Sequence, residues 1–273
     1  MPPTLLDIQP LAVDYRRNGG RPFRAVDGVS LTVQAGESVG IVGESGCGKS
    51  TLARAVLGLE PIAEGEILFE GRSLAAFTRA DWAAYRGAVQ MIFQDSLGTL
   101  NPRMSVGATL REAIRFHHRV PRGEETKEVA RLLDLVELPA DLAERYPHEL
   151  SGGQRQRISI ARALAVNPRL IVADEPVSAL DVSIQANVIH LLERLRRDLG
   201  VAFLFIAHDL AVVRALCPVA HVMHAGRVVE SGPTTELFAH PRDPYTRTLL
   251  DAVPDVKRGL AQRTPASRES EVR

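Results

Sequence analysis

A glycine-rich loop places the strongest constraint on how this chain can fold. Residues 43–51 read Gly-Glu-Ser-Gly-Cys-Gly-Lys-Ser-Thr and fit the pattern G-x-x-x-x-G-K-[ST] in full. The apolar segment 38–42 before the loop predicts a strand, and residues 49–59 after it carry apolar side chains at helical spacing. Such a strand, loop and helix turn successive backbone N–H groups toward a phosphate at the positive end of the helix. The sequence therefore predicts an α/β fold built around a phosphate-binding loop.

The residue types of the loop suggest a role for each of its members. Lys49 is expected to bridge the β- and γ-phosphates of a nucleotide, and the Ser50 hydroxyl is expected to ligate Mg²⁺. Glycines let the backbone approach phosphate oxygens without a clash from a Cβ atom. The other loop residues expected to contact the nucleotide are Gly43, Ser45, Gly46, Cys47, Gly48 and Thr51.

Two acidic residues follow a second apolar segment. Residues 170–173 read Leu-Ile-Val-Ala, which is typical of a buried parallel strand, and Asp174 and Glu175 come next. Because ligands of α/β sheets bind at the carboxyl ends of the strands, both carboxylates are expected near the phosphates. There Asp174 could hold Mg²⁺ through water, and Glu175 could polarise the attacking water. Taken alone, the two acids could equally be a solvated exit from the strand.

The rest of the chain supplies the other parts of an α/β fold. Residues 5–15 and 26–33 alternate apolar and polar side chains, which predicts antiparallel strands with a turn at 18–20. Residues 106–136 and 156–166 carry apolar side chains at helical spacing. A strand, a helix and a strand then follow at 170–173, 184–197 and 202–206, as in a parallel sheet.

The composition excludes several classes of protein. Lys and Arg number 33 and Asp and Glu number 33, so no global basic field favours nucleic acid. The longest apolar stretches are far shorter than the roughly 20 residues that span a bilayer. The two cysteines, Cys47 and Cys217, have no metal-ligand spacing.

A second glycine-rich segment narrows the possibilities. Residues 150–154 read Leu-Ser-Gly-Gly-Gln and resemble the signature of the ABC ATPase family. In that family Ser151, Gly152, Gly153 and Gln154 would bind the γ-phosphate of a nucleotide held by the opposite subunit, at a helix N-terminus. The alternative is a loop in which Ser151 serves only as a helix N-cap.

Other motifs of that family occur in the expected order. Gln94 matches the Q-loop glutamine that contacts Mg²⁺, and Asp181 matches the D-loop that crosses the dimer interface. His208 matches the switch histidine that contacts the γ-phosphate. Tyr15 resembles the aromatic residue that stacks on adenine, with Phe23 as a rival for that role.

The resemblance covers about residues 5–250 and implies a P-loop NTPase (RecA-like) core. It also implies an N-terminal antiparallel β subdomain and an inserted α-helical subdomain at about 94–165. The ATP-binding cassette would span 1–233. Residues 234–273 would form an extension of the oligopeptide-transporter type, with a polar tail from Pro254 that is expected to be mobile.

The same resemblance implies partners and a place in the cell. Two cassettes would close over two molecules of ATP, so a paralogous ATPase or a second copy of this chain is expected. Two transmembrane permease subunits would form the pore, and an external substrate-binding protein would act indirectly. The implied location is the cytoplasmic face of the bacterial inner membrane, with no nucleic-acid partner.

Flanking residues resemble a narrower group, the ATPases of oligopeptide, dipeptide and nickel importers. The similar segments are 94–95 with 100–103, 147–149, 180–186 and 240–250. The pattern favours peptide as cargo and leaves nickel open. No cysteine follows Cys217, so the C-terminal iron–sulfur cluster of some members is not expected. The scattered histidines are expected at the surface or at strand edges, and they are His117, His118, His221, His224 and His240.

Proteins of another kind remain as alternatives. Soluble ABC ATPases that act on DNA carry a long coiled coil between the P-loop and the signature, and those that act on ribosomes carry two cassettes. This chain has an insert of ordinary length and a single set of motifs. An exporter ATPase is disfavoured by the C-terminal extension.

Overall fold

The computed structural model describes residues 3–15, 22–94, 98–117, 119–178 and 180–252. The turn predicted at 18–20 and the polar tail predicted from Pro254 lie outside these residues. Within the described part, no helix is both long enough and apolar enough to cross a membrane.

A small antiparallel sheet forms the N-terminal part of the fold. Its strand order is β2–β1–β4–β5, and its strands are β1 Thr4–Tyr15, β2 Phe23–Gln34, β4 Glu64–Phe69 and β5 Arg72–Ser73. Alternate residues are buried over residues 29–33 of β2, as expected of a sheet with one covered face, whereas irregularities in the pairing interrupt this pattern in β1. The antiparallel pairing predicted from the sequence is confirmed, with Ile8 opposite Leu31 and Tyr15 opposite Phe23.

A larger sheet carries the phosphate-binding loop. Its order is β10–β9–β3–β8–β7–β6. Its strands are β3 Ser38–Val42, β6 Val89–Ile92, β7 Leu170–Asp174, β8 Ala202–Ala207, β9 Val219–His224 and β10 Arg227–Pro233. All neighbouring strands run parallel except β10, which pairs antiparallel with β9. The parallel strands therefore present their carboxyl ends at one edge.

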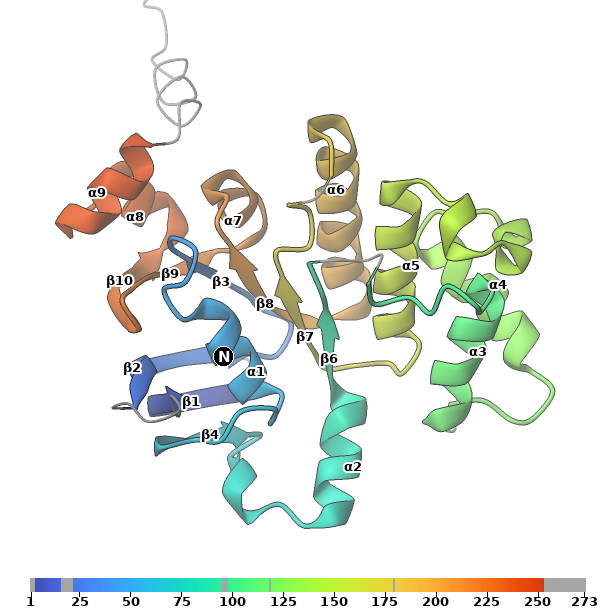
Figure 1. The fold of residues 1–273 in the computed structure, drawn as a ribbon, viewed down its shortest axis with the longest axis horizontal. Helices are drawn as coiled ribbons and strands as arrows, with labels where there is room; N and C mark the ends of the chain where they lie inside the picture. Colours follow the sequence, from blue (N-terminus) through green and yellow to red (C-terminus); the bar gives the residue numbers. More distant parts are fainter. Residues whose placement is uncertain (1–2, 16–21, 95–97, 118, 179, 253–273) are drawn as a thin grey trace, which may run out of the picture.

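Helices surround the larger sheet and extend beyond one end of it. They are α1 Lys49–Val56, α2 Arg79–Ala88, α3 Val106–Phe116, α4 Glu125–Leu135, α5 Gly152–Leu164, α6 Val182–Leu199, α7 Leu210–Leu216, α8 Thr234–Ala239 and α9 Pro244–Asp251. Short 3₁₀ helices lie at Leu74–Ala76, Ala140–Glu144 and Pro147–Glu149. Figure 1 shows α3 and α4 at one end of the long axis and α8 and α9 at the other.

The two faces of the larger sheet belong to two hydrophobic cores. Leu204 and Ile206 of β8 pack with α1 and the antiparallel sheet. Phe203 and Phe205, which point the other way, belong to a second cluster that includes the buried side chains of helices α3 to α7. Since side chains alternate along a strand, one strand contributes to both cores. This arrangement fixes the loop between β3 and α1 on a rigid support.

Two of the predicted helices differ from those observed. The helix predicted over 49–59 ends at Val56, because Gly58 adopts a left-handed conformation with φ +69°. The helical pattern of 106–136 forms two helices, α3 and α4, separated by a segment that contains Pro121 and Gly123. Helix α2 was not predicted, although Thr78 and Asp81 form a capping box at its start.

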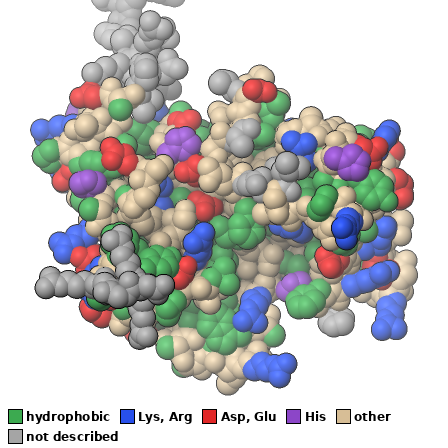
Figure 2. Space-filling view, in the orientation of Figure 1, with side chains coloured by type: hydrophobic (Ala, Val, Ile, Leu, Met, Phe, Trp, Pro, Cys, Tyr) green, Lys and Arg blue, Asp and Glu red, His purple; other side chains and the backbone are tan. Residues whose placement is uncertain are grey.

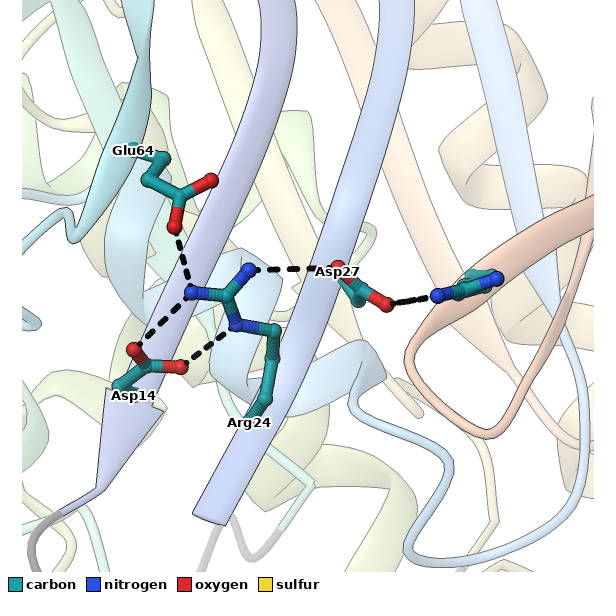
Figure 3. A network of polar contacts seen from close by, with 5 residues as sticks. Asp14, Arg24, Asp27 and Glu64 are labelled. Carbon is teal, nitrogen blue, oxygen red and sulfur yellow. Dashed lines mark hydrogen bonds and ion pairs between the residues drawn. The ribbon is translucent and has the colours of Figure 1, made fainter. Parts of the chain in front are cut away.

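A network of ion pairs joins the two sheets (Figure 3). Arg24 of β2 bonds to Asp14 of β1 at 2.9 Å and to Glu64 of β4 at 2.6 Å. Asp27, also on β2, accepts a hydrogen bond of 2.6 Å from Arg227 of β10. Exposed pairs of this kind contribute little stability individually. Their consequence is positional, because they hold the β9–β10 hairpin against β2.

Candidate nucleotide site

The P-loop lies between β3 and α1 at the carboxyl edge of the larger sheet. Gly48 has φ +108°, and a Cβ atom there would stand 2.2 Å from the Ala25 carbonyl oxygen. A Cβ atom on Gly43 would stand 2.1 Å from the Met223 carbonyl oxygen. Both positions therefore require glycine, because neighbouring backbone fills the space that a side chain would need. The outer side of the loop is supported by the turn after β9, where the Gly226 N–H donates to the Cys47 carbonyl at 2.9 Å.

Lys49 stands at the centre of the loop. Its side chain is buried, and its ammonium donates to the carbonyl oxygens of Gly43 at 2.7 Å and Glu44 at 2.8 Å. Ser50, at the first turn of α1, donates from its hydroxyl to Asp174 Oδ1 at 3.4 Å. The structure thus places Ser50, the magnesium ligand predicted in the P-loop, beside Asp174 at the end of β7.

Glu175 contacts the other two predicted catalytic residues, Gln94 and His208. Gln94 Nε2 donates to Glu175 Oε2 at 2.8 Å, and His208 Nδ1 lies 3.1 Å from the same oxygen. The residues come from the ends of β6, β7 and β8, which are adjacent in the sheet. Glu175 has φ +46°, a conformation that costs free energy in a non-glycine residue and is common at functional sites.

The donor set of this corner fits a magnesium ion. It offers the Ser50 hydroxyl, the Asp174 carboxylate and the Gln94 amide oxygen, and hard oxygen ligands are what Mg²⁺ prefers. Burial raises the pKa of Asp174, while the hydrogen bond from Ser50 lowers it and the neighbouring Glu175 charge raises it further. A divalent cation there would offset this unfavourable burial of negative charge.

A cleft of about 320 Å³ runs along the P-loop. Most of the predicted nucleotide contacts line it, namely Tyr15, Ser45, Gly46, Gly48, Lys49, Ser50, Thr51, Gln94 and Glu175. Phe23 and Ala25 of β2 complete its wall. Asp174 and His208 do not line the cleft, but they contact the lining residues Ser50 and Glu175, respectively. The cleft therefore has a phosphate end at the sheet edge and an aromatic end at β1 and β2.

Tyr15 and Phe23 face each other across β1 and β2 at the aromatic end. The Tyr15 hydroxyl donates to Glu60 Oε1 at 2.8 Å and lies 3.3 Å from Thr51 Oγ1. These bonds hold the Tyr15 ring against α1, whereas the Phe23 side chain is largely exposed. Glu60 had no sequence signal, because the contact joins residues 45 positions apart.

Substitution of Tyr15 and of Phe23 tests which of the two rings stacks on the adenine of ATP. We expect Tyr15→Ala to weaken ATP binding about tenfold, since stacking of a base on an aromatic ring is worth about 1–3 kcal/mol. Tyr15→Phe keeps the ring and is expected to bind nearly as well as the native chain. Titration with a fluorescent ATP analogue measures both. A tenfold loss in Phe23→Ala alone would assign the stacking role to Phe23.

The signature segment lies on α5, away from this cleft. Among the described residues that line the cleft, none comes from residues 151–154. Ser151 caps α5, because its Oγ accepts from the Gln154 N–H at 3.3 Å and the Gln154 Oε1 accepts from the Ser151 N–H at 2.9 Å. The N-cap interpretation of Ser151 is therefore correct for the isolated chain, and it leaves the exposed serine free to take a second role.

Helix α6 holds the signature segment in place. A Cβ atom on Gly153 would stand 2.7 Å from Ile184 Cγ2, so only glycine permits this approach of α5 to α6. Gln185 was not predicted as a functional residue. Its amide donates to the carbonyl oxygens of Val177 and Leu180 at 3.1 and 3.0 Å. These bonds order the segment before Asp181, which is exposed at the start of α6.

One expectation about the histidines is wrong. His221 was expected at the surface or a strand edge, but it is buried in β9, which lies between β3 and β10. Burial disfavours the charged imidazolium and lowers the pKa of His221 to about 4. Residues 220–223 of β9 are all buried, because this strand lies inside the larger sheet, and that position was not recognised in the sequence.

Comparison with known proteins identifies the family. Residues 26–178, more than half of the chain, match the family model described as ABC transporter. The chain belongs to the ABC transporter family. Residues 229–272 of this ABC ATPase match a second model, described as oligopeptide/dipeptide transporter, C-terminal region.

Curated relatives and solved structures agree with this assignment. The oligopeptide transport ATP-binding protein OppF of Escherichia coli (strain K12) is 47% identical over 259 residues, which is 92% of this chain and 78% of that protein. The dimeric structure of MJ0796, a bacterial ABC transporter cassette, has a TM-score of 0.76 at 28% identity, with 84% of this chain and 99% of that chain covered. The same cassette bound to ADP and Pi has a TM-score of 0.73 with the same identity and coverage. This ABC ATPase therefore has the cassette fold and binds nucleotide.

Proposed function

We propose that this ABC ATPase is the ATP-hydrolysing subunit of an importer of oligopeptides or dipeptides. Its relatives named OppF are oligopeptide transport ATP-binding proteins, and the C-terminal match carries the same substrate class. The observation that carries the proposal is the division of the site. The cleft is lined by the P-loop and Glu175, with Asp174 and His208 bonded to its lining residues, while the signature stands elsewhere on the same chain.

A second cassette completes the site. We place Ser151 and the glycine amides of this chain on the γ-phosphate of ATP held by a partner, and the partner's signature on ATP held here. Asp181 would lie at the interface between the two. The dimeric MJ0796 cassette supports this arrangement, because its fold is the same. The second cassette is a paralogue or another copy of this chain.

Within the closed site the chain's own residues divide the work of hydrolysis. Lys49 neutralises the β- and γ-phosphates, and Glu175 polarises the attacking water and takes its proton. Gln94 and His208 hold the Glu175 carboxylate by their bonds of 2.8 and 3.1 Å. Mg²⁺, held by Ser50, Gln94 and Asp174, would supply further neutralisation of the phosphate charge.

Permease subunits would dock on the helical subdomain, which we place at about residues 94–165. An open groove of about 740 Å³ lies there, lined by Pro102, Asp141, Glu144, Arg145, Tyr146, His148 and Glu149. The Tyr146 ring is exposed and stacks on His148 at 5.9 Å. Aromatic and Arg side chains are enriched at contact surfaces, and Tyr146 and Arg145 supply both kinds here. Docking of two permeases would hold the cassette at the cytoplasmic face of the inner membrane.

Nucleic acid is not favoured as a partner. On the face shown in Figure 2, acidic and basic side chains are interspersed and no continuous basic band is formed. A phosphate backbone is bound by clustered Lys and Arg side chains. Nickel, the other cargo that the sequence left open, is not favoured either, because the matching relatives and the C-terminal family model are named for peptide transport.

Substitution of Ser151 tests whether each nucleotide site is shared between the P-loop of one cassette and the signature of the other. We expect Ser151→Ala to lower ATP turnover at least about tenfold, because a donor to the transferring phosphate is lost. Ser105→Ala is the matched control, since Ser105 caps α3 through the same bond, from the Ala108 N–H at 3.2 Å. Each substitution costs about 1 kcal/mol of helix capping. Equal turnover in the two variants would contradict the assigned role of Ser151.

The cargo is tested in the assembled complex. The chain is purified with its permeases in lipid vesicles, and ATP turnover is measured with the cognate binding protein loaded with oligopeptide, dipeptide or Ni²⁺. We expect stimulation by a peptide-loaded protein. Stimulation by the Ni²⁺-loaded protein alone would transfer the cargo assignment to nickel.

A further inference from the structure

The C-terminal extension reaches back to the P-loop. The hydroxyl oxygen of Tyr245, on α9, accepts a hydrogen bond of 3.0 Å from the backbone N–H of Glu44. The two residues are 201 positions apart in the chain. In Figure 1 α9 stands beside β10, on the side of the larger sheet away from the helical subdomain. The contact therefore links an appended element to the first residues of the phosphate loop.

The Tyr245 ring is firmly placed. It stacks on His224, at the end of β9, with centroids 3.9 Å apart and planes 19° apart. Its own backbone N–H donates to Asp243 Oδ1 at 2.8 Å, which caps α9. The next residue, Thr246, is buried, as is Leu250 one turn further. The hydroxyl is thus presented to Glu44 by a ring with little freedom to move.

A carboxylate of β10 anchors the segment that leads into α9. Glu230 accepts hydrogen bonds from the backbone N–H groups of Arg242 at 2.9 Å and Asp243 at 3.1 Å. Charge-assisted bonds of this type are stronger than neutral ones. The extension is therefore attached to the same hairpin whose turn supports Cys47 of the P-loop.

One peptide unit joins Tyr245 to Lys49. The Glu44 N–H and the Gly43 carbonyl belong to the same planar peptide, and in the trans form they point in opposite directions. The N–H bonds to Tyr245, and the carbonyl oxygen accepts from the Lys49 ammonium at 2.7 Å. Rotation of this peptide would turn the carbonyl away from Lys49. Glycine at position 43 offers little resistance to such rotation, so the bond from outside the loop adds a restraint to those that Lys49 makes within it.

We propose that Tyr245 is a positioning residue for Lys49, acting through the peptide between Gly43 and Glu44. By fixing this peptide, Tyr245 keeps the ammonium in the loop, ready for phosphate, and lowers the ordering cost of ATP binding. The inference rests on the proposed function, because it assumes that the P-loop of this chain binds ATP. It adds that the C-terminal extension takes part in the nucleotide site.

The test is Tyr245→Phe in the full chain, which removes one hydroxyl and keeps the stacked ring. We expect KM for ATP and the directly measured dissociation constant to rise about three- to tenfold, with kcat changed less than about twofold. Thr248→Ala is the matched control, because it removes an exposed hydroxyl from the same helix. His224→Ala should act in the same direction through the loosened ring, and His224→Phe should restore affinity.

A merely structural role for Tyr245 predicts a different pattern. It would lower the thermal midpoint in Tyr245→Phe and leave KM unchanged, and that result would overturn the proposal. If Tyr245 acts only by positioning Lys49, its hydroxyl should have no effect once Lys49 is removed. The dissociation constants of ADP from Lys49→Met and from Lys49→Met/Tyr245→Phe should therefore be equal. A further loss in the double variant would also overturn it. Failure of the native chain to bind ATP would instead refute the proposed function.

Discussion

Glu175→Gln is expected to bind ATP normally and to lose at least about 99% of turnover, because a general base contributes about 10²–10⁴-fold to rate. The amide keeps an oxygen that can accept from Gln94, so the corner formed by Gln94, Glu175 and His208 should persist. ATP that is bound and not hydrolysed should then hold two cassettes together. Turnover is measured by phosphate release, and assembly is measured by light scattering with ATP.

The control for this variant is Glu124→Gln, which makes the same chemical change on an exposed glutamate at the start of α4. It should leave both turnover and assembly unchanged. If Glu175→Gln retained turnover within about tenfold of the native chain, the activation of water would have to be assigned to another group.

Lys49→Met should weaken ATP binding at least about 100-fold. Hydrogen bonds to charged groups are worth about 1.5–3 kcal/mol each, and Lys49 is expected to bridge two phosphates. Methionine keeps the aliphatic length of the buried stem, so the packing around α1 should be largely preserved. Calorimetric titration with ATP checks the affinity, and thermal unfolding checks the fold.

Lys127→Met provides the comparison for Lys49→Met, since Lys127 is an exposed lysine on α4. We expect it to bind ATP as the native chain does. Binding by Lys49→Met within about fivefold of native would remove Lys49 from the phosphate site, given the strength of the charged bonds involved.

The central site was accessible from sequence because its parts are local. A P-loop needs only a strand, nine loop residues and a helix start, all of which appear in order in residues 38–59. The Asp174–Glu175 pair ends a buried strand, and strand ends of a parallel sheet share one edge. Topology therefore brings Glu175 to Gln94 and His208 without further information.

Long-range contacts were not accessible in the same way. Glu60 meets Tyr15, and Tyr245 meets Glu44, only after the sheets and helices have packed. Their sequence positions carry no periodicity or motif that indicates a partner. The end of α1 was also missed, because the apolar spacing continues to Leu59 while the left-handed Gly58 terminates the helix.

The described residues at 175–178 and 180–185 connect the Glu175 corner to helix α5, which carries residues 152–154. At one end, Ser178 Oγ donates to the Glu175 carbonyl at 3.2 Å, next to the residue expected to activate water. At the other, Ile184 fills the space opposite Gly153 on the signature helix. A shift of Gly153 toward ATP on a partner cassette would displace Ile184 at the start of α6. The bonds of Gln185, the next residue, would then pass this movement to the segment that follows Glu175. In the proposed dimer, closure at one nucleotide site would therefore affect when ATP is hydrolysed at the other.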